Sequence, residues 1–356
     1  MKIGILTFSC AYNYGAMLQC YALQEYLYSL GCEVKIINYR PSYLTCKKPE
    51  FNFVDFLLSV KNKHLISYSK KYLTLLRRYN MFRKFESKYL NLTEACFTDK
   101  DIFKATKDFH DIIIGSDQVW CSRFNGEESI WFGSGFPDSI KIIFYAVSAG
   151  NSNIDYIKQH YKQILRSVHI SVRERELREI LCNLSIYSTC VLDPTLMAPQ
   201  SIWKPFFTQN KHGRYILVRQ ARPDDKIYYV AKELADRINC RVITADVHDD
   251  SFKYASEVIT CNPFDFVSLV KNACCVITNS FHGLAVSIIT ETNFYVVKEN
   301  DGYDERSRNL LKQLYLEERM IEYGHIPEFC EINYSIVNKR LEYIRNESQR
   351  FLTNSI

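Results

Sequence analysis

The feature of the sequence that most constrains the fold is an alternation of short apolar runs with helical segments. The first unit consists of an apolar run, a polar turn, an amphipathic segment and a second apolar run, at residues 2–8, 12–15, 16–30 and 33–39. Short apolar runs bounded by turns predict buried strands, and a strand–helix–strand order predicts a parallel sheet. Further apolar runs occupy residues 111–114, 141–147, 168–172 and 190–192. We therefore expect an α/β protein.

A second series of the same kind follows a stretch with prolines and polar residues near 199–213. Its predicted strands are 215–219, 241–244, 274–278 and 294–297, and its predicted helices are 224–238, 264–272, 284–290 and 304–316. A single core rarely grows beyond about 250–300 residues, so a chain of 356 residues favours two domains. We predict Rossmann-like domains at 1–198 and 199–330 that face a cleft. A final helix in 331–356 is expected to pack back on the N-terminal domain.

Residues 43–98 form a basic and aromatic insertion that is expected to be mostly helical. Between Lys61 and Lys88, nine Lys or Arg residues accompany one acid, Glu86, and aromatic residues recur at helical spacing. Two interpretations remain open, a helix whose aromatic face packs on the core or a helix that lies on an anionic membrane surface. The net charge of +5 is too small to indicate nucleic acid as a partner.

The 13 cysteines are scattered, and no C-x-x-C or metal-ligand cluster occurs in the sequence. This usage favours a reducing compartment and predicts no metal site. The first apolar run is too short for a signal peptide, and no run reaches the roughly 18 apolar residues that span a bilayer. We expect a cytoplasmic protein, which the second interpretation of the insertion would place at the inner face of the cell membrane.

Glycine is scarce, with 12 residues in 356, about half of the usual share of roughly 7%. Neither G-x-G-x-x-G nor G-x-x-x-x-G-K-[ST] occurs, so dinucleotide and P-loop chemistry of the common kind is excluded. If the protein binds phosphate, we expect it to use cationic side chains and helix N-termini.

The strongest local pattern is an apolar strand that runs into Asn279-Ser280-Phe281-His282-Gly283 at the start of a helix. His282 would sit beside free backbone N–H groups, as a general acid or as a cation toward phosphate. The alternative is a histidine that only orders the turn. Arg173 also follows a predicted strand. Its guanidinium suits a carboxylate or phosphate, and the alternative is a salt bridge with Glu174.

Other polar residues follow predicted strands in the same way. Asp117 could act as a general base or could cap the next segment. Trp120 could stack on a sugar or belong to the core. In the segment 13–15, Gly15 could allow a close backbone approach, and the alternative is ordinary turn chemistry. Arg306 and Arg308 precede a helix, where they either reach the cleft or remain solvated.

Taken in order, these motifs resemble those of the polysaccharide pyruvyl transferase family. The matching segments are 13–19 with 21–23, 115–120, 145–150, 171–174, 193–195, 278–283 and 306–311. The resemblance implies a GT-B-like fold, which consists of two Rossmann-like domains facing a cleft. It also implies transfer of pyruvate from phosphoenolpyruvate to a sugar of a capsule, another exopolysaccharide or a lipid-linked precursor. The reaction forms a ketal, releases phosphate and needs phosphoenolpyruvate as co-substrate but no cofactor.

The resemblance further implies that Arg173 and His282 hold the donor, with His282 as acid and Asp117 as base. The C-terminal domain would bind the donor and the N-terminal domain the acceptor. The residues expected to bind substrate are Asn13, Tyr14, Gly15, Ser116, Gln118, Trp120, Asn279, Ser280, Phe281, Gly283, Arg306 and Arg308.

One position departs from the family pattern, because Ser280 stands where characterised members often carry an arginine. Either Arg306, Arg308 or Arg219 supplies the missing charge, or the donor differs. Two other functions therefore remain open, a GT-B glycosyltransferase with a nucleotide-sugar donor and a carbohydrate-binding protein with a degenerate site.

Overall fold

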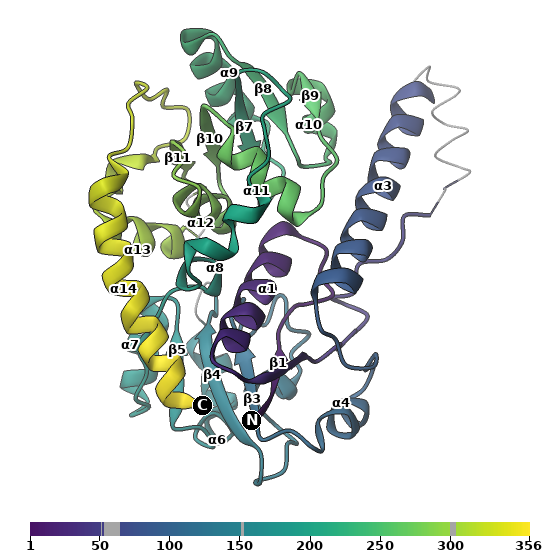
Figure 1. Cartoon of the computed structure of the whole chain (residues 1–356), viewed down its shortest axis with the longest axis vertical. Helices are drawn as coiled ribbons and strands as arrows, with labels where there is room; N and C mark the ends of the chain where they lie inside the picture. The colour runs from purple at the N-terminus through teal and green to yellow at the C-terminus, as the bar shows by residue number, and fades with distance from the viewer. Residues whose placement is uncertain (51, 53–64, 151–152, 300–303) are drawn as a thin grey trace.

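The computed structural model describes residues 1–50, 52, 65–150, 153–299 and 304–356. Within these residues, the strands form two six-stranded sheets in which every pairing is parallel (Figure 1). The first sheet contains β1 (Lys2–Leu6), β2 (Glu33–Ile36), β3 (Asp111–Gly115), β4 (Lys141–Val147), β5 (His169–Val172) and β6 (Thr189–Cys190). The second contains β7 (Tyr215–Arg219), β8 (Arg241–Thr244), β9 (Glu257–Val258), β10 (Cys275–Thr278), β11 (Phe294–Val297) and β12 (Met320–Ile321). The expected α/β architecture is confirmed.

Helices connect the strands, as parallel pairing requires. In the first half these are α1 (Tyr14–Ser29), α3 (Leu65–Tyr89), α4 (Asp99–Thr106), α5 (Ile154–Gln159), α6 (Tyr161–Ile164) and α7 (Arg175–Asn183). After β6 come α8 (Pro194–Met197), α9 (Lys226–Ile238), α10 (Asp249–Tyr254), α11 (Pro263–Lys271), α12 (Phe281–Ile289), α13 (Glu305–Leu314) and α14 (Tyr334–Ser355). The chain changes sheet between β6 and β7, an interval that includes the boundary expected at 198–199.

The order of strands fixes where a ligand can bind. The first sheet has the order β2-β1-β3-β4-β5-β6, and the second has β12-β11-β10-β7-β8-β9. In each sheet the chain reverses its winding direction once, between β1 and β3 in the first and between β7 and β10 in the second. At such a switch point the loops leave in opposite directions and open a crevice outside the carboxyl ends of the strands. The topology therefore favours a site formed by residues that follow these four strands.

The two halves share one hydrophobic core cluster, which includes residues of α1, α8, α11, α12 and α14. The ring of Tyr14 on α1 stacks on Phe266 of α11, with centroids 4.3 Å apart. Tyr21 on α1 meets Phe264 edge-on at 4.9 Å. Aromatic rings bury large areas and fix their neighbours in position. These contacts hold the N-terminus of α1 close to the second half.

Helix α14 crosses from the second half to the first, along one side of the molecule (Figure 1). Near its start, the Tyr334 hydroxyl donates to the carbonyl of Thr292 at 2.7 Å. Near its end, Ser348 Oγ accepts from the backbone N–H of Leu192 at 2.9 Å. The end of the C-terminal helix thus contacts the first half.

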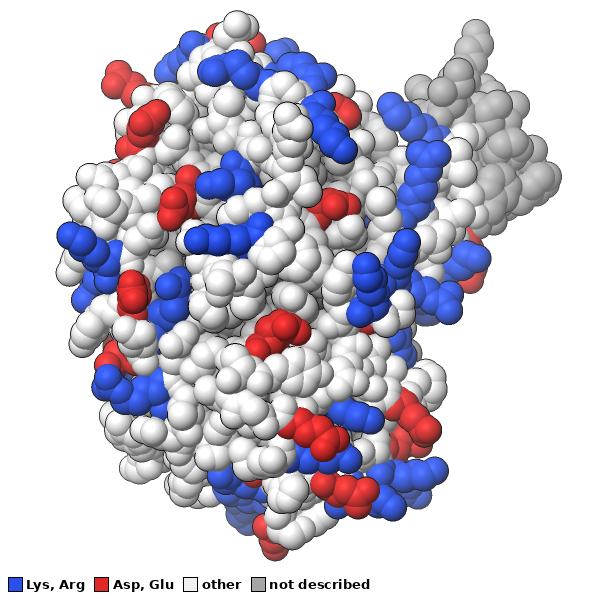
Figure 2. All heavy atoms as spheres, viewed as in Figure 1, with Lys and Arg blue, Asp and Glu red and all other residues white. Residues whose placement is uncertain are grey.

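Helix α3 carries most of the basic insertion, of which residues 51 and 53–64 lie outside the described part of the chain. Its inner face buries Phe82 and Phe85. Its acid, Glu86, is buried in an ion pair with Arg40 at 2.5 Å. The outer face exposes the cations Lys70, Arg77, Arg83, Lys84 and Lys88. Figure 2 shows a row of Lys and Arg along this helix. None of the helices in the described residues has the length and hydropathy needed to cross a bilayer.

The predicted starts of the two helices that border the crevice are wrong. Helix α1 begins at Tyr14, because the side chain of Asn13 caps it by accepting from the Ala16 N–H at 2.8 Å. Tyr14 and Gly15 are therefore helical, and not part of a turn. Helix α12 begins at Phe281, three residues before the predicted start, because Ser280 is its N-cap. Both helices consequently direct their N-termini at the crevice.

Candidate functional site

A cavity of about 360 Å³ lies between the carboxyl ends of the two sheets. Most of its wall comes from segments that follow β1, β3, β7 and β10, the four strands of the two switch points. The lining residues are Phe8, Ala11, Asn13, Leu44, Asp117, Gln118, Arg123, Phe124, Arg219, Ala221, Arg222, Asn279, Ser280, Phe281, His282, Asp304, Arg306 and Ser307. Its volume is in the range of small-molecule sites.

The cavity is electropositive. Among its described lining residues are four arginines and one histidine against two aspartates. The N-termini of α1 and α12 add the partial positive charge of their unpaired N–H groups. An anionic ligand fits this environment better than a neutral or cationic one.

His282 occupies the second position of α12 and touches α1 of the other half. A Cβ added at Gly15 would lie only 2.1 Å from His282 Nδ1 and 2.2 Å from Cγ. Real Cβ atoms do not approach other atoms so closely, so only glycine fits at position 15. The helix-start glycine thus makes room for the imidazole instead of shaping a turn.

Asp193, at the start of α8, joins two of the candidate residues. Its carboxylate lies 2.9 Å from the Arg173 guanidinium and 3.6 Å from His282 Nε2. Burial raises the pKa of Asp193, but the charge of Arg173 and the nearby imidazole of His282 lower it by more, so that the net pKa lies below its ordinary value. The carboxylate therefore remains ionised and orients both partners. The sequence analysis quoted Asp193 in a motif but gave it no role.

Arg173 does not line the cavity. It lies behind Phe281, with its guanidinium 5.1 Å from that ring, and it donates to the carbonyl of Ser116. Arg306 lies 5.7 Å from the same ring and faces the cavity. A void of about 20 Å³, large enough for one water molecule, separates Arg173 from Arg306. In this conformation Arg306 is the member of the pair that a ligand in the cavity can touch.

Asp117 lines the cavity from the first half, opposite the α12 N-terminus. Its side chain accepts from the Gln118 N–H at 2.8 Å. The turn before it is tight, because Gly115 and Ser116 have positive φ angles of 141° and 65°. A Cβ at Gly115 would lie 2.3 Å from the carbonyl oxygen of Tyr145. This turn directs the carboxylate of Asp117 into the cavity, within reach of a ligand hydroxyl.

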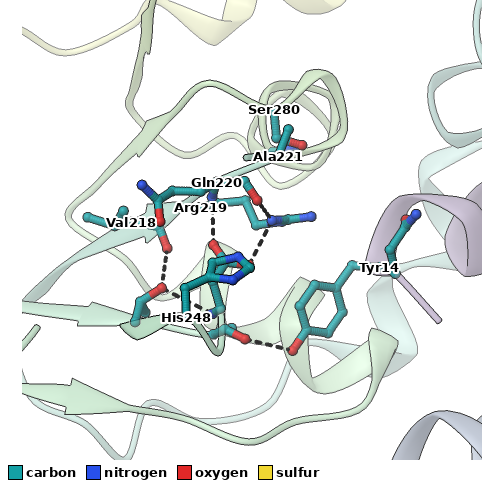
Figure 3. A network of polar contacts seen from close by, with 12 residues as sticks. Tyr14, Val218, Arg219, Gln220, Ala221, His248 and Ser280 are labelled. Atoms are coloured by element: carbon teal, nitrogen blue, oxygen red, sulfur yellow. Dashed lines mark hydrogen bonds and ion pairs between the residues drawn. The ribbon is translucent and has the colours of Figure 1, made fainter. Parts of the chain in front are cut away.

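Arg219 ends β7 and reaches the cavity beside Ser280. Figure 3 shows its guanidinium between the start of α12 and the ring of Tyr14. It forms an ion pair with Asp246 at 2.7 Å, and it lies 5.6 Å from the Tyr14 ring centroid. The backbone N–H of Gln220 donates to the second oxygen of Asp246 at 2.6 Å. The arginine is thus fixed by the second sheet and touches the first half.

Asn279 and Ser280 have structural partners at the cavity wall. Asn279 accepts from the Ala221 N–H at 2.7 Å and donates to Glu299 at 2.5 Å. Glu299 also forms an ion pair with Arg222. Ser280 Oγ accepts from the Gly283 N–H at 3.4 Å, as the α12 cap. A Cβ at Gly283 would lie 2.3 Å from Thr278 Oγ1, so this glycine allows α12 to pack on β10.

Seven of the expected site residues do not line the cavity: Arg173, Gly15, Gly283 and Ser116, which belong to the segments described above, and also Trp120, Tyr14 and Arg308. Trp120 is 1% exposed, and its indole donates to the Trp131 carbonyl at 3.1 Å. Tyr14 is buried, with its hydroxyl donating to the carbonyl of Ala245. Arg308 is exposed on α13, and its Nε lies 3.5 Å from a carboxylate oxygen of Glu305. The periodicity of a short segment does not show which face of its element is buried, which is why these three were included.

The sequence analysis missed several wall residues. Those to which it gave no site role are Phe8, Ala11, Leu44, Arg123, Phe124, Ala221, Arg222, Asp304 and Ser307. Ala221 and Arg222 directly follow β7, so the strand-end rule would have found them. Leu44 and the 123–124 segment come from long loops, whose path no periodicity predicts. Among the described residues, no group of three or more His, Cys, Asp and Glu side chains is placed to hold a metal ion.

Comparison with solved structures identifies the fold. The chain is similar to a putative UDP-N-acetylglucosamine 2-epimerase from Listeria monocytogenes, with 8% identity, a TM-score of 0.50 and coverage of 100% of this chain and 91% of that one. It is also similar to the UDP-GlcNAc 2-epimerase of Methanocaldococcus jannaschii solved with UDP-GlcNAc and UDP, with 11% identity, a TM-score of 0.50 and coverage of 98% and 94%. These are GT-B proteins, so the expected GT-B-like fold is confirmed.

Comparison of the sequence identifies the family. A search of curated proteins found no significant match. The family model for polysaccharide pyruvyl transferase, however, matches residues 13–301. This range begins at the α1 cap and includes every strand of both sheets from β2 to β11. The chain therefore belongs to the polysaccharide pyruvyl transferase family.

Proposed function

We propose that the protein transfers pyruvate from phosphoenolpyruvate to two hydroxyls of a sugar in a cell-surface polysaccharide or its lipid-linked precursor. The observation that carries this proposal is the composition of one cavity. An imidazole (His282) and a carboxylate (Asp117) face the same space from opposite halves, among several guanidinium groups. A donor with a carboxylate and a phosphate needs such cations, and ketal formation needs both an acid and a base.

In the proposed reaction, two hydroxyl oxygens of the sugar bond to C2 of phosphoenolpyruvate and phosphate is released. Asp117 accepts the proton of the first attacking hydroxyl, whose oxygen bonds to C2 of phosphoenolpyruvate. His282 donates a proton to C3, which becomes the methyl group. The second hydroxyl oxygen then bonds to C2, the C2–O bond to phosphate breaks, and the proton of that hydroxyl leaves with the phosphate. The guanidinium groups would stabilise the negative charge that the donor carries throughout.

The placement of these groups suggests which half binds the donor and which binds the acceptor. His282 and Arg219 belong to the second half and lie at the α12 N-terminus, which suits the anionic donor. Asp117, Gln118 and Phe124 belong to the first half and provide polar and aromatic groups for a sugar. The first half thus supplies the acceptor side and the second half the donor side in this proposal.

The basic outer face of α3 supports a peripheral contact with an anionic membrane, which would bring a lipid-linked acceptor to the enzyme. Its exposed cations have no exposed acid among them on the described part of α3, and such a face binds anionic lipids electrostatically. Packing of the inner face on the core does not conflict with this contact, because the two faces are opposite.

The proposal is tested by phosphate release from phosphoenolpyruvate in the presence of polysaccharide or lipid-linked sugar from the cell that makes the protein. His282→Ala should reduce the rate at least about 100-fold, as expected for a lost acid, while circular dichroism remains unchanged. Phosphoenolpyruvate should raise the melting temperature, because a ligand that binds only the folded state stabilises it. Stabilisation by UDP-sugars but not by phosphoenolpyruvate would instead favour a nucleotide-sugar transferase. Sugar binding without any donor binding would favour a degenerate carbohydrate-binding protein.

A further inference from the structure

We propose that Arg219, oriented by Asp246, receives the phosphate group of the donor together with the N-terminus of α12. This inference rests on the proposed function for the identity of the donor. The sequence analysis named Arg219 only as one of three arginines that could supply the charge missing at Ser280.

Arg219 lies at the switch point of the second sheet. It is the last residue of β7, and its register partner on β10 is Thr278. These two strands form the switch point of the second sheet, where the crevice for ligands opens. The Thr278 hydroxyl donates to the Arg219 carbonyl at 2.7 Å, which fixes the arginine backbone to the strand that leads into α12. Arg219 is thus placed where ligand groups bind in folds of this kind.

The buried side chain of Arg219 contains an unsatisfied donor. The Arg219 side chain is 9% exposed, and that of Asp246 is 2% exposed. The Nη1 atom of Arg219 is bound to Asp246, but the buried Nε has no hydrogen-bond partner in the structure. Buried donors are almost always satisfied. A ligand oxygen in the adjoining cavity would provide the missing acceptor.

Arg219 also lies beside the N-terminus of α12. Helix α12 has nine residues, and a Cβ added at Gly283 in its first turn would lie 3.1 Å from Arg219 Cγ. The stem of the arginine therefore runs directly along the helix start. The first N–H groups of a helix have no intrahelical acceptor, and Ser280 Oγ accepts from only one of them, at Gly283. The guanidinium and the free N–H groups approach the same volume.

These donors suit phosphate better than carboxylate. A phosphate has three oxygens that point in different directions, and it can accept from a helix end and a side chain at once. Ser280 is small and buried, so it leaves space at the helix start that a larger side chain would fill. Asp246, whose side chain is 2% exposed, positions the guanidinium and does not line the cavity. The second half thereby holds a phosphate site made of a fixed cation and a helix terminus.

The experiment measures binding of two probes, inorganic phosphate and oxalate, by calorimetry, and the KM for phosphoenolpyruvate by phosphate release. Arg219→Ala should weaken phosphate binding about 10- to 100-fold, the range of a lost charge-assisted hydrogen bond. Oxalate, a dicarboxylate, should be affected less. Arg219→Lys should retain part of the phosphate affinity, because it keeps the charge. Asp246→Asn should raise the KM for phosphoenolpyruvate while the KM for the acceptor remains unchanged.

Arg40→Ala is the matched control. Arg40 also forms an ion pair with a buried acid, Glu86, but its own side chain is 20% exposed and does not line the cavity, so its loss should leave phosphate affinity unchanged. Equal phosphate affinity in the wild type and Arg219→Ala, with both proteins folded, would overturn the proposal. So would an equal loss of oxalate and phosphate affinity, or an equal loss in the Arg40 variant. If Arg219→Ala fails to fold, Arg219→Gln and Arg219→Lys provide the same comparison. A wild type that binds phosphate at Arg219 but does not turn over phosphoenolpyruvate would refute the proposed function alone.

Discussion

The contact between Gly15 and His282 leads to a prediction whose sign is opposite to the usual one. Alanine has a higher helix propensity than glycine by about 1 kcal/mol, and Gly15 lies inside α1. Gly15→Ala would therefore stabilise an isolated helix. In the folded protein, however, the added Cβ would lie 2.1 Å from His282 Nδ1. To reach an ordinary contact of about 3.4 Å, the ring or the helix would have to retreat by about 1.3 Å.

The size of this displacement sets the expected effect. It is large enough to break the 3.6 Å approach of His282 to Asp193. Overpacking of a dense core costs about 1–3 kcal/mol, which outweighs the gain in helix propensity. A displacement of about 1 Å at a reacting group can also reduce the rate about 100-fold. Gly15→Ala should consequently lower both the melting temperature and the rate of phosphate release.

A double-mutant cycle separates the clash from other effects and requires no activity. His282→Ala removes the ring, so Gly15→Ala in that background should be neutral or stabilising by up to about 1 kcal/mol. The free energies of unfolding of the four proteins, obtained from their melting curves, should therefore give a coupling free energy of about 1–3 kcal/mol. If Gly15→Ala changes the melting temperature equally in both backgrounds, the imidazole does not occupy the space beside α1, and the reasoning fails.

Three further predictions concern other parts of the molecule. Asp193→Asn should lower the free energy of unfolding by about 3 kcal/mol at pH 7, because it leaves the buried Arg173 without its anion. The folded-state pKa of Asp193 is lowered, so its stabilisation is present above the unfolded pKa of about 3.9 and is lost as the pH falls further; denaturant titrations should show nearly the same difference between wild type and variant at pH 7 and pH 4, and a smaller difference at pH 2. Gly115→Ala should destabilise by at least about 2 kcal/mol, since its φ angle of 141° and a carbonyl 2.3 Å from the added Cβ leave no relaxed geometry; an unchanged melting temperature would contradict this. Arg77→Glu with Lys84→Glu should abolish co-sedimentation with vesicles rich in phosphatidylglycerol without changing turnover of a water-soluble acceptor, and binding that persists would exclude the outer face of α3 as the membrane contact.

The sequence predicted most of the fold because periodicity and strand-end chemistry are local. Strands β4, β7, β8 and β11 have the predicted bounds, since each is an apolar run that ends at a turn signal. The two-residue strands β9 and β12 were not predicted. Such short edge pairings depend on a neighbouring strand and not on their own composition. The early start of α12 was also missed, because its cap, Ser280, was interpreted as a ligand-binding residue and not as the residue before a helix.

The site was predicted less completely, because its wall combines residues that only the tertiary structure brings together. His282, Asp117 and Arg306 line the cavity, and each follows a strand or opens a helix. Arg173 follows the same rule but lies behind Phe281, since the rule gives the end of the strand and not the direction of the side chain. Asp193, which contacts both Arg173 and His282, comes from the start of another helix.

The path of the backbone between the halves limits how the cavity can open. The chain passes from the first sheet to the second between β6 and β7, and it returns through α14, whose end contacts the first half. The two halves are thus joined by two separate stretches of backbone, which limit how far one can move relative to the other. An opening of the cavity would separate His282 from Gly15 and would also disturb the core cluster that the two halves share. The termini both lie on the first half (Figure 1), so attachment to a surface through either end would hold the first half directly and the second half only through the two connections and the shared core.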